Sequence, residues 1–167
     1  ADFFKDGFLD VDTLRLMKKS GMHRVSIGVE SGSQKVLDYL QKDLDRSLIL
    51  QSAEVCQAAD VRPSYSFMVG LPPEEDADVL DTLKVIDEID DRIESWSVVG
   101  PQIFRPYPGS TILPDCEAAG WEPPESNKQW VRFVQDENYS PDARDVPWIN
   151  NPGLVNTVYF YTALVAL

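Results

Sequence analysis

A strand that ends abruptly constrains this sequence more than any other feature. Residues 62–69 are mostly apolar, and they break into Gly70-Leu71-Pro72-Pro73-Glu74 before an acidic helix begins. Glycine permits a positive φ and proline is favoured in the first turn of a helix, so the run predicts a strand followed at once by a helix. Ligands of α/β sheets bind at the carboxyl ends of parallel strands. We therefore expect backbone donors and acceptors to be exposed here at a nucleoside or cofactor edge, although a plain strand-to-helix turn explains the same residues.

The same alternation of strand and helix recurs on both sides of this turn. Helices are expected after Asp10, Ser33, Asp45 and Glu74, and strands at 23–30, 62–70 and 96–104. Strands that are separated by helices pair in parallel through right-handed crossovers, so the fold class is α/β, a layer or a piece of a barrel. After Phe104 the periodicity weakens, and we expect a short helix at 110–119, irregular chain, and a last helix from about Leu154.

Composition limits the kind of protein. The 167 residues are 43% hydrophobic, enough for one core, and 28 acidic residues against 15 basic ones argue against binding to nucleic acid or to anionic lipid. No apolar run is long enough for a membrane span and no secretory leader opens the chain, so a cytoplasmic location is expected. Three parallel strands leave sheet edges uncovered, and we expect further chain before Ala1.

Residues suited to ligand binding follow each expected strand. The candidates are Glu30 and Ser31 at the first strand, Met68, Val69, Gly70, Leu71 and Pro72 at the second, and Gln102, Arg105 and Tyr107 at the third. A carboxylate at a strand end can accept hydrogen bonds from ribose hydroxyls or an ammonium group, and an arginine can clamp a carboxylate. Helix capping explains Glu30 and Ser31 equally well. Core packing explains the apolar residues, and a surface ion pair explains Arg105.

Several catalytic signatures do not occur. The sequence has no Ser-His-Asp arrangement, no Walker phosphate loop and no GxGxxG. Its single histidine, His23, precedes a strand and would lie at the opposite rim of the sheet. Cys56 and Cys116 are far apart and form no CxxC pair, so neither a disulfide framework nor a zinc site is expected.

Five segments taken in order carry a family resemblance. They are Lys18-Lys19-Ser20-Gly21-Met22, Ile27-Gly28-Val29-Glu30-Ser31-Gly32-Ser33, Leu40-Gln41-Lys42, Phe67-Met68-Val69-Gly70-Leu71-Pro72-Pro73-Glu74 and Arg105-Pro106-Tyr107-Pro108-Gly109-Ser110. In order and spacing, over roughly residues 9–122, this set resembles the radical S-adenosylmethionine (SAM) superfamily. The resemblance is to the class with an amino-terminal cobalamin-binding domain, which includes proteins like the anaerobic magnesium-protoporphyrin ester cyclase.

The resemblance implies a partial, TIM-like (β/α) barrel of six strands in which a CxxxCxxC loop holds a [4Fe-4S] cluster. Such enzymes cleave SAM reductively to a 5'-deoxyadenosyl radical. Residues 1–110 would be the carboxyl-terminal half of that barrel, and 111–167 an irregular and helical extension. By the same resemblance, Glu30 and Ser31 would face the methionine or ribose part of SAM and Met68 through Pro72 its adenine. Gln102 and Arg105 would also contact SAM, with Tyr107 near a small-molecule substrate.

The sequence also departs from the family pattern. CxxxCxxC, the first three strands and a Gly-Gly-Glu segment are absent, and Pro73 stands where the family often has glycine. Two distant cysteines cannot ligate such a cluster, so the chain alone is expected to be inactive and to act with the rest of its polypeptide. The chemistry of the whole would be hydrogen abstraction or cobalamin-dependent methyl transfer. Two other hypotheses remain: a noncatalytic half-barrel that binds a protein, and a fragment of a TIM-barrel hydrolase or lyase with Glu30 as acid or base.

Overall fold

The computed structural model describes residues 4, 7, 9–135 and 143–165 of the chain. Its centre is a parallel sheet of β1 (Arg24–Glu30), β2 (Arg62–Val69) and β3 (Ser97–Ile103), in the order β1-β2-β3. The helices are α2 (Val11–Lys19), α3 (Gln34–Tyr39), α4 (Arg46–Ala58), α5 (Asp76–Arg92), α6 (Leu113–Ala118), α7 (Asn127–Gln135) and α8 (Pro152–Val165), with a 3-10 turn, η1 (Ala143–Asp145). The predicted α/β class and parallel pairing are confirmed.

Helix caps fix where several of these elements begin. The Asp10 carboxylate accepts a hydrogen bond from the amide of Thr13 (2.7 Å), and the Asp45 carboxylate accepts one from the amide of Leu48 (2.8 Å). Each satisfies an amide that the first turn of a helix cannot pair internally. The two capping aspartates recognised in the sequence therefore set the starts of α2 and α4.

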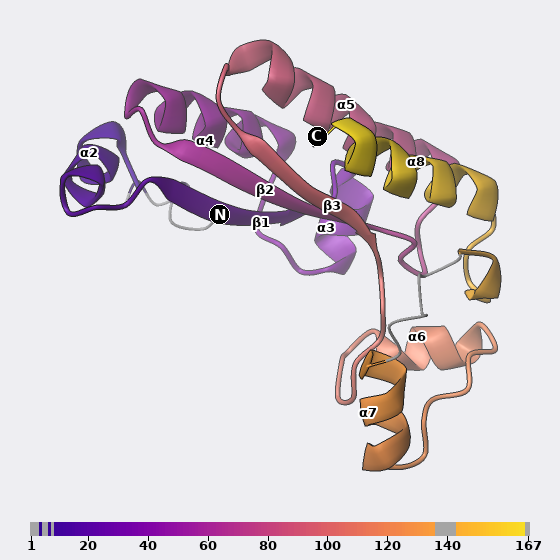
Figure 1. Cartoon of the computed structure of the whole chain (residues 1–167). Helices are drawn as coiled ribbons and strands as arrows, with labels where there is room; N and C mark the ends of the chain where they lie inside the picture. Colours follow the sequence, from indigo (N-terminus) through magenta and orange to yellow (C-terminus); the bar gives the residue numbers. More distant parts are fainter. Residues whose placement is uncertain (1–3, 5–6, 8, 136–142, 166–167) are drawn as a thin grey trace.

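Helices cover one face of the sheet. α4 and α5 lie against it, and α8 runs beside α5 and β3 (Figure 1). The side chains they bury come from alternate strand positions, including Ile27 and Val29 of β1 and Tyr65 and Phe67 of β2. This period of two is what a strand with one covered face requires. The core thus lies between the sheet and its helical layer.

The opposite face of the sheet carries mostly small or polar side chains. Cross-strand pairing places Gly28 beside Ser66 and Ser66 beside Val99, and farther along it places Met68 beside Gln102. Val99 is 48% exposed, and Gln102 is also exposed. We call this surface the open face and define it by these residues together with Ser26.

An apolar cluster closes the carboxyl ends of the strands. Its buried members, which we call the rim cluster, are Val36, Leu71, Phe104, Cys116, Val146 and Trp148. They come from α3, from the residues that follow β2 and β3, from α6, and from the segment before α8. α6 and α7 lie beyond this end of β3 (Figure 1).

One local expectation is wrong. The short helix expected at 110–119 is present as Leu113–Ala118, but the chain expected to be irregular after it contains α7. Ser126 and Gln129 form a reciprocal cap there: the Gln129 amide donates to the Ser126 hydroxyl (3.3 Å), and the Ser126 amide donates to the Gln129 side chain (3.0 Å). This Ser-x-x-Gln pattern is a helix start that sequence reasoning overlooked. α8 begins at Pro152, close to the expected Leu154.

Candidate functional site

Glu30 ends β1 in an unusual backbone conformation. Its φ is +72°, in the left-handed region that costs a residue with a side chain about 1–2 kcal/mol. The pairing with β2 shifts register between Gly28 and Glu30. A Cβ built on Gly28 would lie 2.7 Å from Glu30 Oε1, so the carboxylate folds back over the open face where glycine leaves room. Backbone strain of this kind persists where the surroundings impose it, often at binding sites.

Lys42 provides the counter-ion of this carboxylate. Its Nζ lies 3.0 Å from Glu30 Oε1, with side-chain exposures of 38% for Lys42 and 19% for Glu30. The pair thus presents both signs of charge at the carboxyl end of β1. A ligand that carries an ammonium group and a carboxylate could bind to both partners.

Ser31 points away from that pair and into the protein. It is fully buried, and its hydroxyl lies 3.2 Å from that of Thr82 in α5. Thr82 also accepts a hydrogen bond from the Gly32 amide (2.9 Å). A Cβ on Gly32 would lie 2.7 Å from the Cα of Thr82, so the turn and the helix are in direct contact. These contacts give Ser31 a structural role.

A buried carboxylate extends this connection. Asp78 accepts hydrogen bonds from the Ser33 hydroxyl (2.6 Å), from Lys35 Nζ (2.8 Å) and from the Glu75 amide (2.9 Å). Burial raises the pKa of Asp78, but the hydrogen bonds outweigh that effect and hold the pKa below its usual value. Asp78 therefore stays ionised and ties α3 to the first turn of α5.

The candidates at the end of β2 divide into two groups. Met68 is half-buried and lies beside Gln102 in the sheet register, near the rim cluster. Val69 and Leu71 are 0% and 1% exposed, and they belong to the core under α8 and to the rim cluster, respectively. Pro72 is half-buried. The structure thus leaves Met68 and Pro72 accessible and uses Val69 and Leu71 in packing.

Gly70 departs from the expectation that its backbone groups are exposed. Its amide donates to the Glu74 carboxylate, and its carbonyl accepts a hydrogen bond from the Trp148 indole (2.7 Å). The Leu71 carbonyl accepts from the Glu74 amide (3.0 Å). Both polar groups of Gly70 and the Leu71 carbonyl are therefore satisfied within the chain, which avoids the cost of a buried peptide group without a partner.

Glu74 is the most perturbed carboxyl group of this region. It is 7% exposed, and its Oε1 is buried without a hydrogen-bond partner among the described residues. Burial raises the pKa of Glu74 to about 7, against the opposing effect of the Gly70 and Leu71 amides. Its role is to hold the turn after β2.

The remaining candidates lie at the end of β3 and between β3 and α6. Gln102 is exposed on the open face, Arg105 is half-buried and Tyr107 is 59% exposed. The carbonyl of Tyr107 accepts a hydrogen bond from the Ser110 amide (3.1 Å), which closes a tight turn. Glu30, Met68 and Gln102 thus lie at the carboxyl halves of three adjacent strands, with Arg105 and Tyr107 just beyond them.

Three residues of this region were not among the sequence candidates. Lys42 lies at a helix end with no pattern pointing to Glu30, and Trp148 is far from Gly70 in the chain. Glu74 had one local signal, since a carboxylate four residues after a glycine turn can reach back to its amides. The other two contacts join segments that only the fold brings together.

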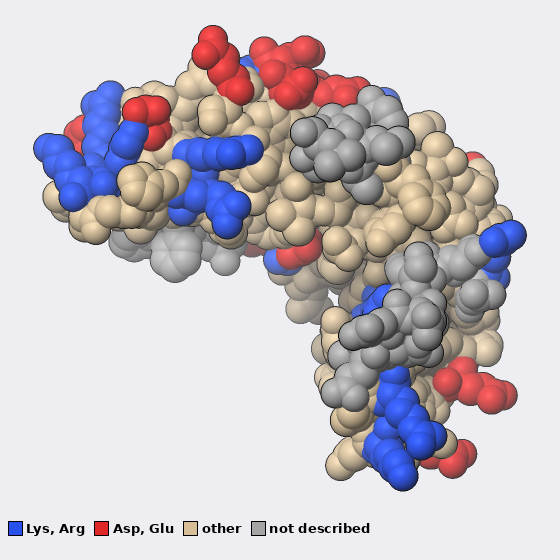
Figure 2. Space-filling view, in the orientation of Figure 1, with Lys and Arg blue, Asp and Glu red and all other residues tan. Residues whose placement is uncertain are grey.

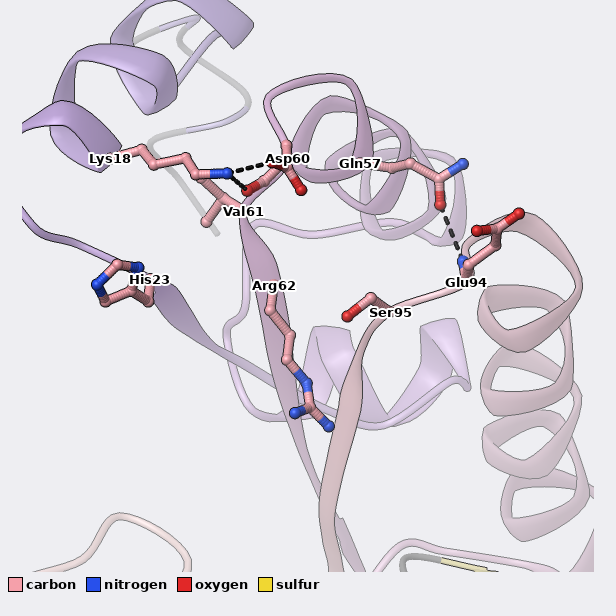
Figure 3. A pocket seen from close by; sticks show the side chains of 8 residues that line it. All are labelled: Lys18, His23, Gln57, Asp60, Val61, Arg62, Glu94 and Ser95. Carbon is pink, nitrogen blue, oxygen red and sulfur yellow. Dashed lines mark hydrogen bonds and ion pairs between the residues drawn. The ribbon is translucent and has the colours of Figure 1, made fainter.

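A hollow of about 410 Å³ lies at the opposite, amino-terminal rim of the sheet (Figure 3). Its lining mixes charges, with Lys18 and Arg62 against Asp60 and Glu94. Most of these groups bind neighbouring segments: Lys18 donates to Asp60, Arg62 donates to the Trp96 carbonyl, and the Glu94 amide donates to Gln57. In (β/α) folds this rim serves stability rather than chemistry.

The cysteines do not fit a metal centre. Cys56 is in α4 and Cys116 is in α6, and both are buried. Burial raises the pKa of the Cys56 thiol to about 12 and that of the Cys116 thiol to about 11, which disfavours the thiolate that binds iron. In the described ranges, no group of three or more His, Cys, Asp or Glu side chains is placed to hold a metal ion.

Charge is distributed unevenly over the surface. Lys and Arg gather around α2, whereas Asp and Glu line the α4–α5 side (Figure 2). The chain carries a net charge of −13. In the part of the chain that the structure describes, no helix has the length and apolar character needed to cross a membrane.

Comparison with protein families identifies a match over residues 5–86, to the radical SAM superfamily. The matched segment contains β1, β2 and most of α5, and it includes Glu30, Lys42 and the turn at Gly70. β3 and all later residues lie outside it.

Two named proteins are similar to parts of the chain. An uncharacterised methyltransferase of Pyrococcus horikoshii is 24% identical over 98 residues, which cover 59% of this chain and 20% of that protein. The anaerobic magnesium-protoporphyrin IX monomethyl ester cyclase of Cereibacter sphaeroides is 25% identical over 97 residues, which cover 58% of this chain and 16% of the cyclase. The chain thus aligns with a fifth or less of each relative.

Proposed function

We propose that this chain is part of a radical SAM enzyme and supplies the SAM-binding wall of its active site. In this proposal residues 1–110 form the carboxyl-terminal half of a partial (β/α) barrel, and residues 111–167 form an extension. The family match over residues 5–86, the two relatives and the parallel order β1-β2-β3 support it. The open face would then line the interior of the barrel.

The Glu30–Lys42 pair is the observation that carries the proposal. SAM bears an ammonium group and a carboxylate on its methionine part, and two hydroxyls on its ribose. Glu30 can accept hydrogen bonds from the ammonium group or the ribose, and Lys42 can bind the carboxylate. The strained backbone of Glu30 is consistent with a residue held for a ligand rather than for stability.

The remaining candidates divide into residues that would contact SAM or substrate and buried residues that would hold them in place. Met68, Pro72 and Gln102 border the open face and would contact the adenine and the ribose, and Arg105 would lie near SAM. Ser31, Val69, Gly70 and Leu71 would hold those residues in place from the buried side. Tyr107, exposed beyond β3, would face the substrate.

The family implies a [4Fe-4S] cluster, which supplies the electron that cleaves SAM to a 5'-deoxyadenosyl radical. The two buried cysteines of this chain do not fit that group, so its ligands would come from elsewhere in the polypeptide. Cobalamin, a small-molecule substrate and a cytoplasmic location complete the proposal. The names of the relatives suggest methyl transfer or ring closure as reaction types.

Anaerobic reconstitution of the full-length gene product tests the proposal. An iron–sulfur absorption band, SAM binding and release of 5'-deoxyadenosine are expected. Glu30→Gln should weaken SAM binding by about 10- to 100-fold, because hydrogen bonds to a charged group contribute about 1.5–3 kcal/mol. Glu94→Gln, an exposed acid at the other rim, is the matched control and should bind SAM normally.

The same measurements separate the alternatives. A protein that binds neither iron–sulfur cluster nor SAM would contradict the proposal and favour a noncatalytic half-barrel or another barrel enzyme. An equal loss of SAM binding in Glu30→Gln and Glu94→Gln would contradict the proposed role of Glu30.

A further inference from the structure

The turn after β2 is held from two sides by residues that local sequence does not connect. Glu74 accepts the hydrogen bond of the Gly70 amide, and Trp148 donates its indole N–H to the Gly70 carbonyl at 2.7 Å. Trp148 is 6% exposed, so this second hydrogen bond is shielded from water. Because both polar groups of Gly70 are used, the orientation of this peptide depends on Trp148.

Ile149 fits against the same glycine. Gly70 has a φ of +78°, and a Cβ at this position would lie 2.7 Å from Ile149 Cδ1. The isoleucine side chain therefore occupies space that exists only because residue 70 has no side chain. Two consecutive residues of the extension thus match the turn, one by a hydrogen bond and one by packing.

The segment that carries them is anchored at both ends. We call residues 146–151 the strap. At its start, the Trp148 ring packs against Phe104 (6.2 Å between centroids) and Trp121 (6.4 Å). At its end, the Asn151 side chain donates to the Asp76 carboxylate (2.8 Å), and its carbonyl accepts from the Val155 amide of α8. The strap is therefore placed by Phe104 and Trp121, by α5 and by α8.

We propose that Trp148 is a positioning residue: it holds the Gly70–Leu71 turn and thereby places the flanking Met68 and Pro72 for contact with the adenine of SAM. This inference rests on the proposed function. Without the indole N–H, the buried Gly70 carbonyl lacks a donor, and the turn must move to reach one. The fraction of molecules ready to bind SAM then falls, and the apparent Kd rises by the same factor.

Trp148→Phe in the reconstituted full-length protein tests this inference. Phenylalanine keeps an aromatic ring at this position and removes the N–H donor together with one ring of the indole. Loss of one uncharged hydrogen bond corresponds to about a fivefold change in the equilibrium between turn conformations, so the Kd for SAM should rise by up to about fivefold. Trp121→Phe makes the same chemical change in a ring that packs on Trp148 and α7, and it should leave the Kd unchanged.

Hydrogen exchange of the backbone over residues 66–74 gives a readout that does not depend on SAM. Exchange should become faster in Trp148→Phe and stay unchanged in Trp121→Phe. If Trp148→Phe does not fold, Asn151→Ala at the exposed end of the strap should show the same two effects in smaller size.

The outcomes distinguish the two proposals. If the unaltered protein does not bind SAM, the proposed function fails and this inference fails with it. If it binds SAM and Trp148→Phe binds equally well, only the positioning role is overturned. Weaker SAM binding without faster exchange over residues 66–74 would also overturn that role.

Discussion

Two glycines show how single residues shape this site. Gly28 leaves room for the Glu30 carboxylate over the open face, whereas Gly32 allows the turn after β1 to lie directly on α5. A Cβ added at Gly28 would meet the end of the flexible Glu30 side chain, whereas a Cβ added at Gly32 would meet the backbone of α5. Adding a methyl group should therefore have different consequences at the two positions.

Gly28→Ala should alter binding more than stability. The new Cβ displaces the Glu30 carboxylate, so SAM binding should weaken about tenfold, while the free energy of unfolding should change by less than about 1 kcal/mol. Gly32→Ala should destabilise the chain by about 3 kcal/mol, since the backbone of α5 cannot move aside easily. Urea unfolding measures the stability of each variant, and SAM titration measures its binding. Equal stability of the two variants would contradict the inference that Gly28 contacts a side chain whereas Gly32 contacts the backbone of α5.

Glu74 should make stability depend on pH. Its pKa in the folded chain is about 7, above the ordinary value of 4.5, so the folded state holds the extra proton between these values. Stability from this group is present at low pH and is lost as pH rises through 7. Relative to the unaltered chain, Glu74→Gln should gain up to roughly 3 kcal/mol between pH 4.5 and 8, since one pKa unit corresponds to about 1.4 kcal/mol. A difference that does not change with pH would show that Glu74 ionises normally.

At the scale of elements, the first turns of α5 organise the carboxyl end of the sheet. Asp76 binds Asn151 of the strap, Asp78 binds Ser33 and Lys35, and Thr82 binds the turn after β1. One helix thus aligns α3, that turn and the strap. The acidic residues here also favour the positive end of the helix dipole.

Thr82→Val should loosen this connection. Valine has nearly the same shape but leaves the buried Gly32 amide without an acceptor, so a loss of about 1–3 kcal/mol is expected in the free energy of unfolding. Thr157→Val is the control, because Thr157 is exposed in α8, and it should cost less than about 0.5 kcal/mol. Similar losses in chemical denaturation of both variants would argue against the buried contact.

For the whole molecule, residues beyond 110 complete the core. Ala143, Val155 and Val158 are buried together with Val69 of β2 and Ile103 of β3. α8 carries no charged residue, and part of its apolar surface is buried in this contact. The final helix therefore belongs to the same folded unit as the sheet.

Val158→Ala should destabilise the whole chain, because Val158 is 1% exposed and its removal leaves a cavity between α8 and the sheet. A loss of about 2 kcal/mol is expected in a single cooperative transition. Phe160→Ala removes a larger side chain that is 59% exposed and should change stability by less than about 0.5 kcal/mol. Two separate transitions in thermal unfolding would show that α8 is not part of the common core.

The sequence alone determined the local elements and the edge of the sheet where the candidate residues lie. Capping aspartates, alternating strand residues and the Gly-Leu-Pro-Pro-Glu break are local signals, and strands separated by helices dictate parallel pairing. Parallel pairing places the carboxyl ends of the strands at one edge of the sheet, so the sequence also indicated where the candidate residues would gather. The cap of α7 was equally local, at Ser126 and Gln129, and could have been found.

Only the tertiary structure decided which candidates face the open sheet and which are buried. Glu30 reaches over Gly28 to Lys42, Ser31 turns inward to Thr82, and the strap closes on Gly70. Most of these contacts join residues from separate elements, and their geometry depends on a register shift and a positive φ that no periodic pattern encodes. Packing and hydrogen-bond satisfaction across the fold select these pairs, so they are absent from any reading of local sequence.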